Sequence, residues 1–471
     1  MTQNTSSRKS VLPLAVVAML GAVVASSRAL AFPSVDFAEI KSHIRFDPAY
    51  VESIEAQTLA EYDRLNDKTA PYYENGRIAA RLLAYQAAGG DFYGEGWLQI
   101  TDLYAADACK RGCRDPLVNA ICDLFVFTRL HSIGQKGAEG HLQRIDTLLA
   151  SEYPALFKFR AAAAGMRNFL RFSEPETKRN EDMSAMTAQL PSLFDKTIKQ
   201  FAALASSAPP GRILQVEVDS FLDHIEDSSI YVSKTGEAID SILADANSPG
   251  EVRSYCRASF LITWAWTARG SDLANTVSKE GWRLMKERLA HATKLLDKAS
   301  EAYPKNTFIP TLMLTVERGQ GIGFYRMERW FKMAVENDPN NYSAYAQKMQ
   351  YLQPRWHGSA NEVLAFADEC LKTGRWEAKI PMVLCKGIRT LAEDIESICK
   401  NEDIWNVMSK TYETFLEKYP KSITYRTEYF EWAVNAKKWD IARRQLGILG
   451  DHWDRFTLEK REFAELKAKI L

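Results

Sequence analysis

Two stretches of similar design, ATKLLDKASEAYPKN at residues 292–306 and MERWFKMAVENDPNN at residues 327–341, decide the fold of this chain. Each has apolar residues three and four positions apart and ends on a proline, as an amphipathic helix that stops at a turn would. Aligned on prolines 35 residues apart, Pro304 and Pro339, they match Leu296 with Phe331 and Ala299 with Ala334. The small alanine lets the second helix of one unit approach its neighbours. The two stretches therefore predict repeated helix-turn-helix units.

The same pattern extends along most of the chain. From about Pro48 onward, apolar residues recur at three and four positions, and the alternation typical of strands is scarce. A Tyr-Pro pair recurs at residues 153, 303 and 419. The 35-residue spacing is close to the ~34-residue period of tetratricopeptide repeats. We therefore predict an all-α fold of tetratricopeptide-like repeats, an α-solenoid, with or without a separate N-terminal helical domain.

Tryptophan content suggests a division of the chain. Ten of the eleven tryptophans lie at or beyond residue 264. We therefore expect an N-terminal helical domain at residues 34–207, a connecting region at 208–250 and a tetratricopeptide-like repeat domain at 251–471. One continuous solenoid is the alternative, because repeat arrays contact only nearest neighbours and have no sharp internal boundaries.

The first residues have the pattern of a secretory signal peptide. Arg8 and Lys9 precede an apolar run at residues 11–24, and Ala29-Leu30-Ala31 follows as a cleavage site. The apolar run is shorter than the ~20 residues that a membrane-spanning helix needs. We expect residues 1–31 to be removed, the mature chain to be periplasmic or secreted, and no integral span to remain. An uncleaved N-terminal anchor is the alternative.

Charge and cysteine content exclude some classes of protein. Lysine plus arginine equals aspartate plus glutamate at 60 each, so we expect no nucleic-acid partner. Seven cysteines, scattered and odd in number, do not form a disulfide framework, although Cys109, Cys113 and Cys122 lie close enough in sequence to pair.

Three further segments carry a resemblance to a known family: AWTARGSDLANTVSKEGW (265–282), MERWFKMAVENDPNNYSAY (327–345) and YLQPRWHGSANEVLAFA (351–367). Over about residues 255–400 the chain resembles an uncharacterised family of exported bacterial proteins with tetratricopeptide-like helical repeats and a domain of unknown function. The resemblance implies a helical-repeat fold and an export signal. It implies no reaction.

The segment PRWHGS, residues 354–359, is the first candidate site. Proline ends one helix, glycine permits the turn and serine caps the next helix, so a structural corner explains the stretch. Alternatively, Arg355, Trp356 and His357 line a groove, where the guanidinium could bind a carboxylate, a phosphate or a sugar hydroxyl.

Three other residues are candidates for the same groove. Trp264 and Arg269 lie near the end of the helix predicted before Gly270, and Trp330 could meet Trp264 or Trp356 from a neighbouring unit. The structural alternative is that the tryptophans fill the core and that Arg269 stabilises the negative end of a helix dipole.

No signature of catalysis or of a metal or cofactor site is recognisable, so we predict no metal, no cofactor and no catalytic residue. The chain has no H-E-x-x-H, C-x-x-C or EF-hand pattern. The leading hypothesis is a non-enzymatic envelope protein that binds a peptide or protein partner in a helical-repeat groove. A carbohydrate-binding protein is the alternative, and an enzyme with a carboxylate pair, which sequence alone does not exclude, is the third.

Overall fold

The computed structural model describes residues 35–42, 47–87, 97–125, 135–172, 187–209, 211–270, 274–450, 452–454 and 457–470. The chain divides into two compact units, Met1–Ala38 and Glu39–Leu471. The predicted signal peptide at residues 1–31 lies outside the described residues. The second unit holds all the described helices from Pro48 onward.

The described residues form helices and no strands, so the all-α prediction is confirmed. The first helices are α2 (Phe37–Ser42), α3 (Pro48–Leu65), α4 (Tyr73–Ala87), α5 (Trp97–Lys110), α6 (Pro116–Phe125), α7 (Gln135–Leu149), α8 (Ala155–Phe172), α10 (Leu190–Ser207), α11 (Arg212–Ile225) and α12 (Ser229–Asp245). They are followed by α13 (Gly250–Arg269), α14 (Lys279–Ala302), α15 (Phe308–Gln320), α16 (Phe324–Asn337), α17 (Tyr342–Tyr351), α18 (Ala360–Lys372), α19 (Met382–Asp394), the 3-10 helix η3 (Glu396–Lys400), α20 (Glu402–Lys418), α21 (Ile423–Asn435), α22 (Trp439–Leu449) and α23 (Lys460–Ala468).

Local chemistry sets several of the helix starts. Asp115 precedes Pro116, and its Oδ1 accepts hydrogen bonds from the backbone amides of Leu117 at 2.9 Å and Val118 at 3.0 Å. Proline loses nothing at the first position of a helix, since its missing amide would have no partner there. The aspartate thus satisfies two amides that the helix leaves open.

The two stretches that predict the repeat end their helices in the same way. Helices α14 and α16 both stop two residues before a proline, Pro304 and Pro339, and α20 stops two residues before Pro420. The matched side chains of α14 and α16 are all buried: Leu296, Ala299, Phe331 and Ala334. Residues that correspond in the sequence alignment are therefore buried in both helices.

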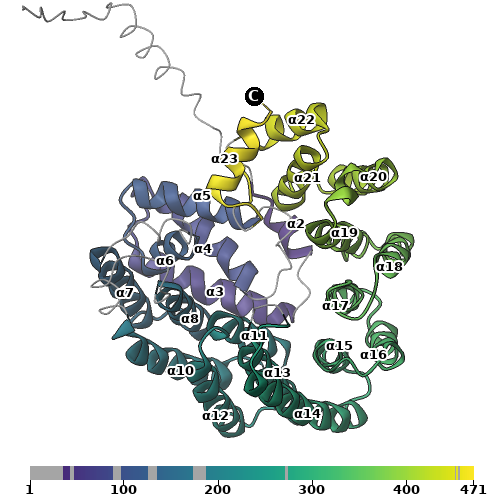
Figure 1. Cartoon of the computed structure of the whole chain (residues 1–471). Helices are drawn as coiled ribbons and strands as arrows, with labels where there is room; N and C mark the ends of the chain where they lie inside the picture. Colours follow the sequence, from purple (N-terminus) through teal and green to yellow (C-terminus); the bar gives the residue numbers. More distant parts are fainter. Residues whose placement is uncertain are drawn as a thin grey trace, which may run out of the picture. The chain divides into compact units, whose positions relative to one another are not determined.

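Most helices that follow one another in the chain pack side by side (Figure 1). The short connections make these neighbours antiparallel. Helices α11, α13, α15, α17 and α19 also contact one another in succession, which makes them one row. Among the described helices, substantial contacts join only neighbours and next-but-one neighbours.

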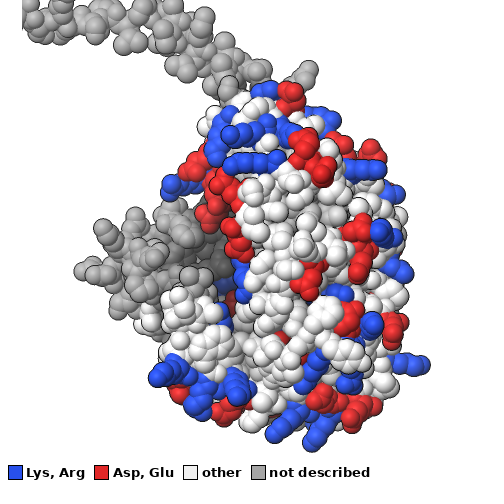
Figure 2. Space-filling model, turned by 45° about the vertical axis from the view of Figure 1, so that its right-hand side comes forward, with Lys and Arg blue, Asp and Glu red and all other residues white. Residues whose placement is uncertain are grey.

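Residues 208–250, predicted as a connecting region, hold α11 and α12. Helix α11 packs on both α8 and α13, so helix packing continues through this region. No helix in the described ranges combines the length and apolar character that crossing a bilayer requires. On the face that Figure 2 shows, basic and acidic side chains are interspersed.

Candidate functional site

The segment PRWHGS forms the corner between α17 and α18. A side chain at Gly358 would place its Cβ 2.2 Å from the carbonyl oxygen of Leu352, so only glycine fits there. Ser359 caps α18, because its Oγ accepts from the amide of Glu362 at 3.4 Å and donates to the Glu362 carboxylate at 2.7 Å. These contacts are those of a tight structural turn.

The guanidinium of Arg355 is occupied within the protein. Its Nε and Nη2 lie 3.0 and 2.9 Å from the two carboxylate oxygens of Asp394, and Nη2 lies 3.1 Å from Glu393. Hydrogen bonding to Asp394 is the main reason that the pKa of Arg355 is raised. Arg355 therefore ties the corner to the end of α19.

Trp356 and His357 join the corner to the end of α15. The Trp356 ring meets the Trp266 ring edge to face, with centroids 5.4 Å apart. Two guanidinium groups lie near the Trp356 ring, that of Arg318 at 5.2 Å and that of Arg269 at 5.8 Å. His357 Nε2 donates to the carbonyl oxygen of Arg318 at 2.7 Å. We call Trp266, Arg269, Arg318 and Trp356 the Trp-Arg cluster.

The other two predicted residues lie outside this cluster. Trp330 is 1% exposed, so no ligand can reach it. Trp264 stacks on Phe260 and lies 3.6 Å below the guanidinium of Arg288. The six predicted residues thus do not line one open face, although Arg269 and Trp356 do come together.

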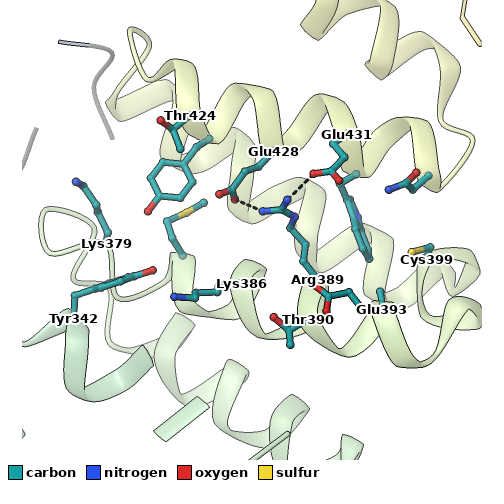
Figure 3. A pocket seen from close by; sticks show the side chains of 15 residues that line it. Tyr342, Lys379, Lys386, Arg389, Thr390, Glu393, Cys399, Thr424, Glu428 and Glu431 are labelled. Carbon is teal, nitrogen blue, oxygen red and sulfur yellow. Dashed lines mark hydrogen bonds and ion pairs between the residues drawn. The ribbon is translucent and has the colours of Figure 1, made fainter. Parts of the chain in front are cut away.

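A pocket lies beside the corner, between α19 and α21. Helix α19 packs on α17, but its backbone does not come close to that of α21, and the pocket of about 670 Å³ lies between α19 and α21. It is lined by Tyr342, Lys379, Met382, Lys386, Arg389, Thr390, Ala392, Glu393, Cys399, Thr424, Tyr425, Glu428, Glu431, Trp432 and Asn435. Figure 3 shows these side chains.

An ion-pair network fixes the middle of the pocket. The Arg389 guanidinium lies 3.1 Å from Glu428 and 2.5 Å from Glu431, one turn further along α21. Glu428 also accepts a hydrogen bond from the hydroxyl of Tyr412 at 3.1 Å. The pKa of Glu428 is raised, because the effect of burial exceeds the opposing effects of the Arg389 charge and the Tyr412 hydrogen bond. Because Arg389 belongs to α19 and both glutamates belong to α21, this network holds the two helices together.

The two ends of the pocket differ in charge. Lys379 and Lys386 lie with Tyr342 at one end, and Glu431, Glu393 and Cys399 lie toward the other (Figure 3). Lys386 is exposed along the pocket wall, yet enough protein surrounds its ammonium group to lower its pKa. The pocket is therefore polarised along its length.

Sequence reasoning missed the pocket and the central members of the Trp-Arg cluster. The spacing of Lys386 and Arg389 on α19, and of Glu428 and Glu431 on α21, places each pair on one helix face. Nothing in the sequence indicates that these two faces meet. In the part of the chain that the structure describes, no group of three or more histidine, cysteine, aspartate or glutamate residues could hold a metal ion.

Comparison with known proteins finds no relative. No protein-family model, no curated protein and no solved structure matches this chain.

Proposed function

We propose that this chain is a non-enzymatic binding protein that holds a polypeptide segment in the pocket between α19 and α21. The observation that carries the proposal is the polarised pocket: about 670 Å³, with lysines at one end, glutamates toward the other and the guanidinium of Arg389 paired with Glu428 and Glu431. A polypeptide offers side chains of both charges and backbone groups that can bond to such walls.

The helix arrangement supports a groove. We propose that the pairs α14/α15, α16/α17 and α20/α21 are tetratricopeptide-like units of an α-solenoid. The backbones of successive members of the row α13, α15, α17 and α19 approach one another closely, whereas α14, α16 and α18 meet only through side chains, as Phe331 and Phe366 do. The first row is the more closely spaced, so the array bends locally toward it. Stacked helix pairs that bend in this way present a concave surface.

The walls favour a polypeptide over a carbohydrate. Sugar rings stack on exposed aromatic faces; of the aromatic side chains that line the pocket, Trp432 is only 2% exposed, whereas Tyr342 and Tyr425 are partly exposed. The accessible charged groups, Lys386 and Glu393, have opposite signs, and neutral sugars have no charge to match them. Carbohydrate binding is therefore the less favoured candidate, and the experiment on this pocket distinguishes the two.

The location and the relatives of the protein are part of the proposal. The basic start, the apolar run and the Ala29-Leu30-Ala31 site support export and cleavage of residues 1–31. The segments at 265–282, 327–345 and 351–367 support membership of the exported bacterial family that they resemble.

The test is selection from a display library of random linear peptides on the purified mature chain. Thr424 lines the pocket, and Thr424→Trp would place a large ring in it. Lys410→Trp, on an exposed position of α20 outside the pocket, is the matched control. We expect selected peptides to bind the natural chain and the control but not Thr424→Trp. Peptides that bind all three proteins equally, or no peptides at all, would refute the pocket as a peptide site. Glycan-array binding lost in Thr424→Trp would replace the proposal with carbohydrate binding.

A further inference from the structure

Arg318 is a basic residue with no acidic partner in the described structure. Its guanidinium lies 5.0 Å from the Trp266 ring and 5.2 Å from the Trp356 ring. Its Nη1 donates to the amide oxygen of Gln347 at 3.4 Å, and its Nε has no hydrogen-bond partner. Burial lowers the pKa of Arg318 to about 10, and no carboxylate among the described residues offsets this effect.

Several basic residues near Arg318 have acidic partners, whereas Arg318 has none among the described residues. Arg326 lies 2.6 Å from Glu317, Arg355 binds Asp394, and Arg389 lies between two glutamates. Removing a charge from water without a counter-charge is unfavourable, and stacking on tryptophan compensates only in part. An anion that approached Arg318 would supply the missing interaction.

Lys386 is a second cation without a described ion pair, and the corner connects it to Arg318. His357 donates to the carbonyl oxygen of Arg318, and Gln353 Nε2 donates to the carbonyl oxygen of Gly387, next to Lys386, at 3.1 Å. The two cations thus flank the same corner. Burial lowers the pKa of Lys386; the nearby charge of Glu428 raises it, and the charge of Arg318 lowers it.

We propose that Arg318 and Lys386 form one binding point for a carboxylate side chain of an acidic polypeptide segment. The two tryptophan rings lie close to the guanidinium, whose Nε has no hydrogen-bond partner, and a planar carboxylate matches the edge of a guanidinium. Lys386 adds a second, more flexible donor from the pocket wall. This inference rests on the proposed function, because it assigns the acidic part of the bound peptide to the lysine end of the pocket.

The test uses two peptides with blocked termini, EEGSGKK and QQGSGKK, which differ only in their acidic pair. Lys386→Gln removes an exposed charge, and Lys410→Gln on α20 is the matched control. We expect the natural chain to bind EEGSGKK about tenfold more tightly than QQGSGKK, as charge-assisted hydrogen bonds allow. Lys386→Gln should abolish the difference, and Lys410→Gln should retain it. Equal binding of the two peptides, or an unchanged preference in Lys386→Gln, would overturn the carboxylate site.

A second measurement keeps the test independent of folding defects in variants. An amine-reactive reagent should label Lys386 less in the presence of EEGSGKK than in the presence of QQGSGKK, while labelling of Lys410 stays the same. Protection by inorganic phosphate but not by EEGSGKK would overturn the proposal in favour of a small-anion site. If library peptides bind the pocket but neither protection nor preference occurs, the proposed function stands and only this inference fails.

Discussion

Arg355 and Trp356 are adjacent in the chain but lie in different surroundings. Arg355 is exposed and ion-paired with exposed carboxylates, which contributes less than about 1 kcal/mol. Trp356 is partly buried against Trp266 and two guanidinium groups. We expect Trp356→Ala to destabilise the protein by about 3 kcal/mol and Arg355→Ala by less than about 1 kcal/mol.

Thermal unfolding followed by circular dichroism distinguishes these two effects. Trp356→Phe serves as the control, because it keeps an aromatic ring at the corner. An Arg355→Ala variant that unfolds at a lower temperature than Trp356→Ala would contradict the packing role of the tryptophan.

Asp219 on α11 is a partly buried residue whose carboxylate is held by two hydroxyl groups. Its Oδ2 accepts from Tyr255 at 2.5 Å, and its Oδ1 accepts from Ser259. Burial raises the pKa of Asp219 to about 6, above its ordinary value of 3.8, and Asp223 on the same helix has a similarly raised pKa. The folded protein therefore binds a proton that the unfolded chain does not bind between these pH values.

The sign of the pH effect follows from this difference. The contribution of Asp219 to stability is full below pH about 4 and is lost as the pH rises through about 6. The free energy of unfolding of Asp219→Asn, compared with that of the natural protein, should therefore rise between pH 5 and pH 7 by on the order of 1 kcal/mol. Unfolding temperatures of both proteins at the two pH values measure this change. A constant difference between them would exclude a raised pKa at Asp219.

At the scale of elements, two glycines should respond oppositely to alanine. Gly358 at the α17–α18 corner has no room for a Cβ beside the Leu352 carbonyl, whereas Gly447 in α22 faces open space. We expect Gly358→Ala to unfold at a clearly lower temperature. Gly447→Ala should be stabilised by about 0.5 to 1 kcal/mol, since alanine favours the helix. Equal effects at the two positions would show that the corner tolerates a wider turn.

At the scale of the whole molecule, the contact pattern predicts tolerance to truncation at helix boundaries. Substantial contacts join only near neighbours among the described helices. A chain that ends at Lys418, after α20, should keep cooperative unfolding and lose helicity only in proportion to its length. It should also lose peptide binding, because α21 forms one wall of the pocket.

A chain cut at Met408, inside α20, is the matched control for this truncation. It should be less stable than the longer chain, because half a helix covers α19 incompletely. If both truncated chains lost their cooperative transition, unfolding would depend on contacts across the whole unit.

The sequence by itself determined the helices and several of their ends. Helical periodicity, the N-cap at Asp115 and the turns before Pro304 and Pro339 act over a few residues, so neighbouring side chains are enough to specify them. The corner at PRWHGS was predictable for the same reason: proline, glycine and serine specify a turn locally.

Only the tertiary structure decided which side chains form a site. Arg389 meets Glu428 across 39 positions of the chain, and Arg318 meets Trp356 across 38. These meetings depend on how helices pack, and similar amphipathic patterns recur in several of the described helices, such as α14 and α16. The pattern therefore indicates which face of a helix is buried, but it does not indicate which polar residues of two helices will share one pocket.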